Sequence, residues 1–244
     1  MNAQGHWTSW RENAERRGVA AHIVAEIGQR YDLTPHSFGL LAKMTEIKDP
    51  RGKSFFLMPP DTSGDDAREA ALLTYVLNAG TDYGKTGKRP TDFPATPYGA
   101  AEIARIMNRQ KANRWSYTRD VAFVHRNGGR LATTPNGILM GVGGNLIQRQ
   151  FSQRGGTTWG DIFMINAGRR TDAAGLLRRI ISSERIDLDR LLHHEERHCR
   201  QWAERGHAGM LKAYGWELFR ELIFGATNRL EADAGLADGG YTSA

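Results

Sequence analysis

The run His-Glu-Glu-Arg-His at residues 194–198 constrains this chain more than any other feature of its sequence. The apolar pattern around it predicts a helix that begins after Asp187, a suitable N-cap, and ends near Gly206. Two histidines four residues apart project from one face of a helix, where both can bind one Zn²⁺ ion. The glutamate after the first histidine can then act as general base on a water molecule at that ion.

The predicted helix has an apolar stripe, and a helical wheel places Glu195 and His198 within it and His194 at its edge. The apolar members of the stripe are Leu188, Leu191, Leu192, Cys199 and Trp202. A carboxylate within such a stripe is costly unless something compensates its charge, and a metal with bound water would do so. The other face, which we expect to point to water, holds Asp189, Arg190, His193, Glu196, Arg197 and Arg200. The alternative is a surface helix whose histidines coincide by chance and whose Glu195 pairs with an arginine.

A catalytic zinc ion needs a third protein ligand and an open position for water. An amphipathic stretch at residues 210–224 follows the motif, and a short helix begins after a turn near Gly225. Glu231 opens this short helix and is the residue that we expect to be the third ligand. Asp233 and Asp238 remain alternatives, and Glu231 could instead interact only with the helix dipole.

An HExxH motif followed by a glutamate on a later helix resembles the gluzincin branch of the zincin metallopeptidases. The resemblance implies a Zn²⁺ cofactor bound by His194, His198 and Glu231, with Glu195 as the base that activates water. It also implies a protein or peptide substrate and a zincin-like fold, in which a sheet edge above the cleft pairs with an extended substrate.

Two further points bear on this resemblance. In thermolysin-like members an aspartate one turn beyond the distal glutamate supports the first histidine, but position 235 here is glycine. Asp233 or Asp238 would have to take over that role. More loosely, residues 194–202 and 234–241 look like zincin-like domains at the ends of large bacterial toxins and effectors, which would imply an inhibitor or immunity protein as a partner.

Peptide hydrolysis also needs a hydrogen-bond donor for the oxyanion. The sequence does not choose among Tyr241, Tyr214 and His207, which lie in the right stretch, and Tyr241 is our first candidate.

The net charge of +6 raises the question of a nucleic-acid partner. The basic residues are scattered, however, and no zinc-finger or RNA-recognition signature accompanies them. We therefore do not favour nucleic acid. The alternative function is a non-enzymatic basic module that binds nucleic acid or protein and has a zincin-like fold with a structural or vacant metal site.

No apolar run approaches the roughly 18 residues that a membrane span requires. The N-terminus reaches Arg11 and Glu12 without the apolar core of a signal peptide. We therefore expect a cytoplasmic protein as synthesised, for which signal-independent export or delivery remains open.

The overall pattern predicts an α+β fold, mostly helical, with a small and mainly antiparallel sheet packed on the HExxH helix. Helices are expected at 10–30, 35–44, 65–77, 98–113 and 171–181, and strands at 54–58, 121–124, 137–142 and 157–165. A loop rich in glycine and proline at residues 79–97 separates a helical N-terminal region (1–97), which can belong to the same domain, from a zincin-like metallopeptidase domain (98–244).

Overall fold

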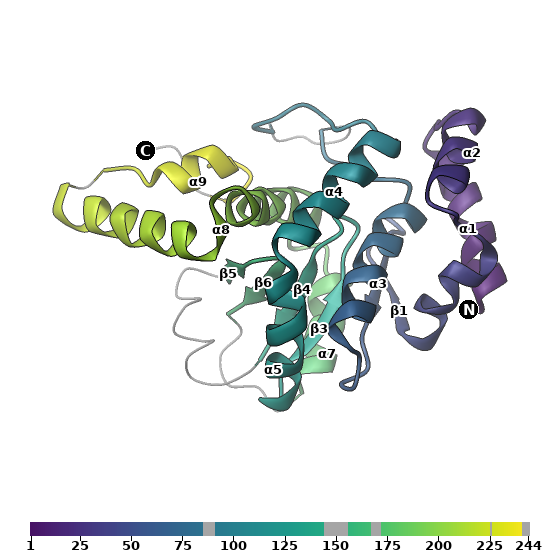
Figure 1. The fold of residues 1–244 in the computed structure, drawn as a ribbon, viewed down its shortest axis with the longest axis horizontal. Coiled ribbons are helices and arrows are strands. Elements are labelled where there is room, and N and C mark those ends of the chain that lie inside the picture. The colour runs from purple at the N-terminus through teal and green to yellow at the C-terminus, as the bar shows by residue number, and fades with distance from the viewer. Residues whose placement is uncertain (85–90, 144–155, 167–171, 225, 241–244) are drawn as a thin grey trace.

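The structure is a computed structural model that describes residues 1–84, 91–143, 156–166, 172–224 and 226–240. It has the α+β architecture that the sequence predicts, with helices on both faces of a central sheet (Figure 1). None of the helices in these ranges has the length and apolar character needed to cross a membrane.

Within the described ranges, six strands form one sheet in the order β1-β2-β3-β4-β6-β5. They are β1 (Thr45–Lys48), β2 (Ser54–Leu57), β3 (Arg130–Thr133), β4 (Leu139–Val142), β5 (Gly156–Trp159) and β6 (Ile162–Ile165). All neighbouring strands are antiparallel except β4 and β6, which are parallel. The expectation of a mainly antiparallel sheet is confirmed. Strands β1 and β2, from the N-terminal region, belong to the same sheet as the later strands.

The helices cover both faces of the sheet because side chains alternate along each strand and both sets are apolar. The α-helices are α1 (Ala3–Arg16), α2 (Ala21–Arg30), α3 (Gly64–Leu77), α4 (Ala100–Ala112), α5 (Val121–Arg126), α7 (Ala173–Ile181), α8 (Leu188–Phe224) and α9 (Arg229–Ala234). On one face, Met140 and Phe163 pack against α7 and α8. On the other face, Leu139 and Ile162 pack against α3 and α5. The HExxH helix α8 therefore packs on the sheet, as expected.

The helix predicted over residues 10–30 is two helices. Gly18 adopts a φ of 70° just after α1, a left-handed conformation that ends the helix. Residues 35–43 form two short 3₁₀-helices, η1 (Pro35–Gly39) and η2 (Leu41–Lys43), rather than one α-helix. Together with α3 and α4, these elements bury a second cluster that includes Trp10 and Phe38.

The strand predicted at residues 121–124 is wrong. These residues begin α5, in which Val121 and Val124 are buried one turn apart and Phe123 points outward. A π-helical turn, η3 (Ser116–Asp120), leads directly into α5. The strand of this region is β3, which follows the turn at residues 127–129. A short β-branched run was therefore ambiguous between strand and helix.

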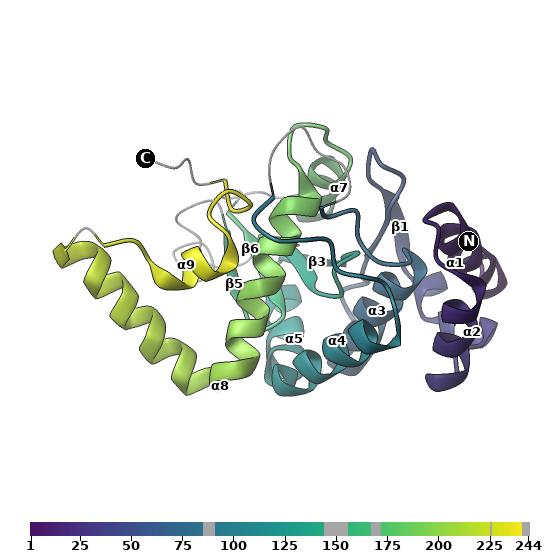
Figure 2. The same ribbon diagram turned by 90° about the horizontal axis from the view of Figure 1, so that it is seen from above.

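The strand predicted over residues 157–165 is a hairpin, in which β5 and β6 are joined by a turn at Gly160. Gly160 has a φ of 62°, and a Cβ atom there would lie 2.6 Å from Cβ of Ser116. The turn thus needs glycine, both for its backbone conformation and for the close approach of η3. As a result β5 is the end strand of the described sheet, on the side of α8 (Figure 2).

Helix α8 bends sharply at Gly206, whose φ of 68° and ψ of 167° are not helical. The sequence predicted that the motif helix would end at this residue, and a new helical segment starts directly after it. Residues 188–205 run across the sheet, while the second segment projects from the body of the molecule (Figures 1 and 2). The chain then returns to the first segment through α9.

Candidate metal centre

The first segment of α8 presents the motif from a well-anchored helix. The amide of Arg190 lies 3.4 Å from Oδ1 of Asp187, so Asp187 caps the helix as predicted. Leu188, Leu192 and Cys199 lie in the core beneath the sheet. Their burial fixes the rotation of the helix about its axis.

Helix α9 brings the third predicted ligand to the two histidines. Asn228 caps α9 by accepting hydrogen bonds from the amides of Leu230 and Glu231. Leu230 is buried against Trp202 and Met210 of α8. The cap and this apolar contact set the position from which the side chain of Glu231 reaches α8.

His194, His198 and Glu231 offer three ligand atoms to one point. The two Nε2 atoms are 3.1 Å apart, and each is 3.3 Å from Oε2 of Glu231. Ligand atoms at about 2.0–2.1 Å from a tetrahedral Zn²⁺ ion lie about 3.3 Å from one another. The spacing of the three atoms therefore matches three corners of a tetrahedral zinc site. Among the described residues, they form a group able to hold a metal ion.

The hydrogen bonds on the far side of each imidazole also fit a metal ion. His194 Nδ1 lies 2.9 Å from the carbonyl oxygen of Gly235, and His198 Nδ1 lies 2.9 Å from Oε1 of Gln201. Both partners are acceptors, so each Nδ1 carries a proton, and a neutral imidazole can then offer the lone pair of its Nε2 to a metal ion. Two lone pairs and a carboxylate oxygen this close repel one another, and either a proton or a metal ion between them would relieve that repulsion.

The pKa shifts of Glu231 and His198 show that this group of side chains favours an added positive charge. Burial would raise the pKa of Glu231, but its contacts with His194 and His198 hold that pKa well below its usual range. Burial would likewise lower the pKa of His198, yet the hydrogen bond to Glu231 and the charge of Glu195 help to raise it to about 9. Oε2 of Glu231 is buried, and both imidazoles face it at 3.3 Å. The site therefore attracts positive charge, which a metal ion would supply in place of a proton.

Glu195 lies beside this group and is held by the edge of the sheet. Its Oε2 atom accepts a hydrogen bond of 2.5 Å from the hydroxyl of Thr158 on β5. Glu195 is buried, and this burial raises its pKa although the two histidines and Thr158 act in the opposite direction. A carboxylate with a raised proton affinity, next to a candidate metal site, suits a general base.

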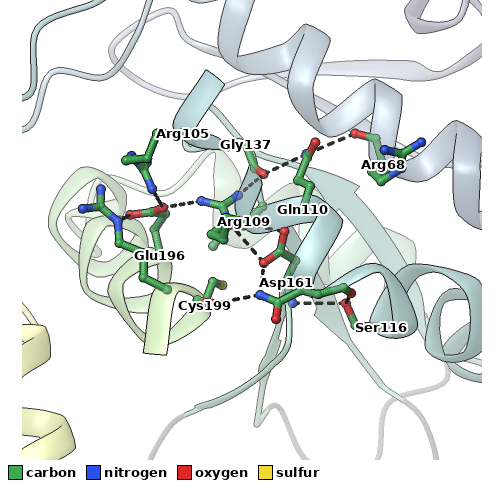
Figure 3. A network of polar contacts seen from close by, with 12 residues as sticks. Arg68, Arg105, Arg109, Gln110, Ser116, Gly137, Asp161, Glu196 and Cys199 are labelled. Carbon is green, nitrogen blue, oxygen red and sulfur yellow. Dashed lines mark hydrogen bonds and ion pairs between the residues drawn. The ribbon is translucent and has the colours of Figure 1, made fainter. Parts of the chain in front are cut away.

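The prediction that Glu196 points to water is wrong. Its side chain is buried between α8 and α4 (Figure 3). It forms ion pairs with Arg105, Arg109 and Arg200. Burial alone would raise the pKa of Glu196, but the charges of these arginines lower it to about 2. The helical wheel predicted exposure because it could not include α4, which supplies Arg105 and Arg109.

The same network continues into the sheet. Arg109 forms a second ion pair with Asp161, which lies in the turn between β5 and β6 and is fully buried. The side-chain amide of Asn113 donates to Oδ1 of Asp161 at 2.7 Å and to the carbonyl of Cys199 at 2.8 Å. Figure 3 shows these contacts joining α4, the hairpin turn and α8. They fix α8 from the side opposite the candidate metal ligands.

His193 is also buried, whereas the sequence placed it in water. Its ring stacks on Tyr83, with ring centroids 3.5 Å apart and planes 7° from parallel. Burial lowers the pKa of His193 to about 4, so it is neutral at pH 7. Residues of the loop after α3 therefore cover this face of the helix, an arrangement that the local sequence around the motif could not reveal.

Of the three candidate oxyanion donors, two lie within the described residues. His207 packs edge-on against Trp115, with ring centroids 4.7 Å apart, in a cluster with Trp159 and Trp202. Tyr214 lies on the projecting segment of α8 and is exposed. Tyr241 lies outside the described residues.

Three residues that support the site were missed by the sequence analysis: Thr158, Gln201 and Gly235. Gln201 could have been found, because it lies one turn after His198 on the same helix. Its side-chain amide also donates to Oδ2 of Asp233 at 2.9 Å, so Asp233 supports the second histidine rather than the first. Thr158 and Gly235 carried no signal, since one comes from a distant strand and the other acts through its backbone.

Comparison with known proteins gives no further guidance. No family model matches the chain, and no curated protein or solved structure matches it. The function is therefore inferred from the geometry of the metal centre and from the residues around it.

Proposed function

We propose that this protein is a zinc-dependent hydrolase, a metallopeptidase of the gluzincin type. The observation that carries the proposal is the spacing of 3.1–3.3 Å among the ligand atoms of His194, His198 and Glu231. Two imidazoles and one carboxylate are one of the donor sets found in catalytic zinc sites, in which a fourth position is left to water and substrate. A structural zinc site would instead close that position with a fourth protein ligand.

Bound Zn²⁺ would lower the pKa of a water molecule and polarise the carbonyl group of a peptide bond. Glu195 takes the proton from the water as it attacks the carbonyl carbon, and later delivers that proton to the departing amide nitrogen. Glu195 can do both because its carboxylate is buried and its pKa is raised. The Thr158 hydroxyl holds one carboxylate oxygen and leaves the other for the water.

In this proposal the fold is zincin-like, and the substrate is an extended polypeptide that pairs with strand β5. Support comes from the position of β5 at the end of the described sheet and from its direct contact with Glu195. An edge strand offers backbone donors and acceptors that an extended peptide can use. The hydrogen bond from Trp202 to the carbonyl of Thr158, 3.0 Å long, keeps this strand close to α8.

The test has two parts, metal content and turnover. Protein purified without added metal should contain one zinc per chain by mass spectrometry, and it should cleave peptides in a complex peptide library. Glu195→Gln should retain the zinc and lose cleavage by at least about 100-fold, the usual contribution of a general base. Glu204→Gln is the matched control, because Glu204 is exposed on the same helix.

The proposal would be overturned by a wild-type protein that binds no zinc. Cleavage by Glu195→Gln at the wild-type rate would equally refute the role of Glu195.

A further inference from the structure

We propose that residues 235–240 form a backbone strap that holds the first metal ligand, His194, and that Asp238 is the positioning residue of this strap. The inference rests on the proposed metal site but concerns residues that do not touch the metal. In the thermolysin-like proteins that the motif resembles, an aspartate side chain supports the first histidine of the motif. Here the carbonyl group of Gly235 takes the place of that side chain, and the strap sets its position.

The carbonyl oxygen of Gly235 accepts two hydrogen bonds. One comes from Nδ1 of His194 at 2.9 Å, and the other from the amide of Gly239 at 3.0 Å. The second bond closes the strap into a turn. Gly235 has a φ of 97°, and a Cβ atom there would lie 2.7 Å from Oδ2 of Asp92 and 2.9 Å from Cε2 of Phe93. The carbonyl can point at His194 only because residue 235 has no side chain.

Gly239 rests directly against the imidazole of His194. A Cβ atom at this residue would lie 2.6 Å from Cε1 and 3.0 Å from Nε2 of that ring. The strap thus restrains the ring by contact as well as by the hydrogen bond from Gly235. Any side chain at residue 239 would push the ring, and with it the ligand atom, away from its place.

Asp238 anchors the strap to the body of the protein. Its side chain is fully buried and accepts hydrogen bonds from the hydroxyl of Tyr83 and from Nε of Arg190, the latter at 3.2 Å. Its amide donates to Oδ2 of Asp92 at 2.9 Å. Arg190 also donates to the carbonyl of Ala237 at 2.7 Å. Tyr83 and Arg190 therefore hold the side chain of Asp238. In the sequence this residue lies between the two glycines that contact His194.

Tyr83 is itself fixed, which makes the anchor stiff. Its ring stacks on His193, next to the ligand His194, and its hydroxyl accepts a hydrogen bond of 2.9 Å from the amide of Phe93. Burial and the hydrogen bond to Asp238 raise the pKa of Tyr83 to about 12, so its hydroxyl remains a donor at neutral pH. The loop after α3, the strap and α8 are thus tied together at Asp238.

The first test compares two glycines in the strap. Gly235→Ala should weaken Zn²⁺ binding about 10- to 100-fold, the usual effect of losing a partner of a metal ligand. Gly240→Ala is the matched control, because Gly240 also has a positive φ, of 80°, but a Cβ atom there meets nothing within 4 Å. Zinc affinity is measured by competition with a chromophoric chelator. Equal affinity of the two variants would overturn the proposal.

The second test reaches the site through the anchor and uses milder changes. Tyr83→Phe removes one hydrogen bond to Asp238 and keeps the stacked ring, and Asp238→Asn removes the charge. Both should lower Zn²⁺ affinity about 10-fold and alter the visible spectrum of the Co²⁺-substituted protein, which a merely structural role would leave unchanged. Wild-type affinity and spectrum in both variants would refute the role of Asp238. A wild-type protein that binds neither metal would instead refute the proposed function.

Discussion

The hydroxyl of Thr158 on the edge strand β5 donates a hydrogen bond of 2.5 Å to the carboxylate of Glu195 on α8. The same threonine accepts a hydrogen bond from Trp202 through its carbonyl, at 3.0 Å. Strand and helix are thus joined at the residue that we propose as the general base. Both Thr158 and Glu195 are buried, so water competes little for this contact.

We expect Thr158→Val to reduce peptide cleavage about 10-fold or more while zinc content stays at one per chain. Valine has nearly the same shape as threonine but cannot hold the carboxylate oxygen, so Glu195 would lose its orientation toward water. The rate of cleavage of a library-derived peptide measures the effect. Thr158→Ser should keep most of the activity, because the hydroxyl remains. Equal rates for the valine and serine variants would contradict this role.

We expect Glu231→Gln to weaken zinc binding by at least about 100-fold. The substitution keeps the size of the side chain but replaces a charged ligand by a neutral amide, which Zn²⁺ binds poorly. Chelator competition measures the affinity, and Glu204→Gln, which changes an exposed glutamate of α8, serves as control. Unchanged affinity would mean that another residue supplies the third ligand.

The sequence predicted which three candidate ligands come together better than it predicted what surrounds them. His194 and His198 are one helical turn apart, so their approach follows from local geometry. Glu231 was chosen because it opens a later helix, and the sequence left Asp233 and Asp238 as alternatives. It could not decide among them, because 32 residues with a bend at Gly206 separate Glu231 from His198. His193 and Glu196 were placed in water because a helical wheel records one helix and not its neighbours.

The same distinction applies to the fold. Elements that the local sequence determines were predicted, and elements that depend on distant contacts were not. Helix α3, capped by Ser63, ends at Leu77 as its periodicity predicts, and β2 lies where its apolar run stands. Residues 121–124 were assigned to a strand because four residues are too few to separate a period of two from one of 3.6. The hairpin at Gly160 was missed because the apolar residues on its two sides read as one strand. Distant pairing, which decides such cases, leaves little trace in a single sequence.

Acid should destabilise the protein through Glu196. Its pKa of about 2 in the folded state lies below the ordinary value of 4.5, so the ionised form stabilises the fold. This contribution, on the order of 3 kcal/mol, is complete above pH 4.5 and is lost as the pH falls toward 2. Urea unfolding of the metal-free protein at several pH values measures it, and metal-free protein avoids the effect of ligand protonation on zinc.

The matched variant for this test is Glu196→Gln. It removes one of the two carboxylates that pair with the buried Arg109, Asp161 being the other, so we expect a loss of about 3 kcal/mol at pH 7. Between pH 4.5 and 2 the variant should lose less stability than the wild-type protein does. Parallel curves for the two proteins would show that other carboxylates account for acid unfolding.

The N-terminal region should be required for the metal centre to form. Strand β2 pairs with β3, and its Phe55 and Leu57 lie in the same core cluster as Leu192 of α8. The buried amine of Lys53 forms an ion pair with Asp189 in the first turn of α8. A fragment of residues 98–244 would therefore expose β3 and part of the core, and it should neither unfold cooperatively on heating nor bind zinc one to one. Adding residues 1–97 as a separate chain should restore both properties, whereas a fragment that folds and binds zinc alone would show that 98–244 is an independent domain.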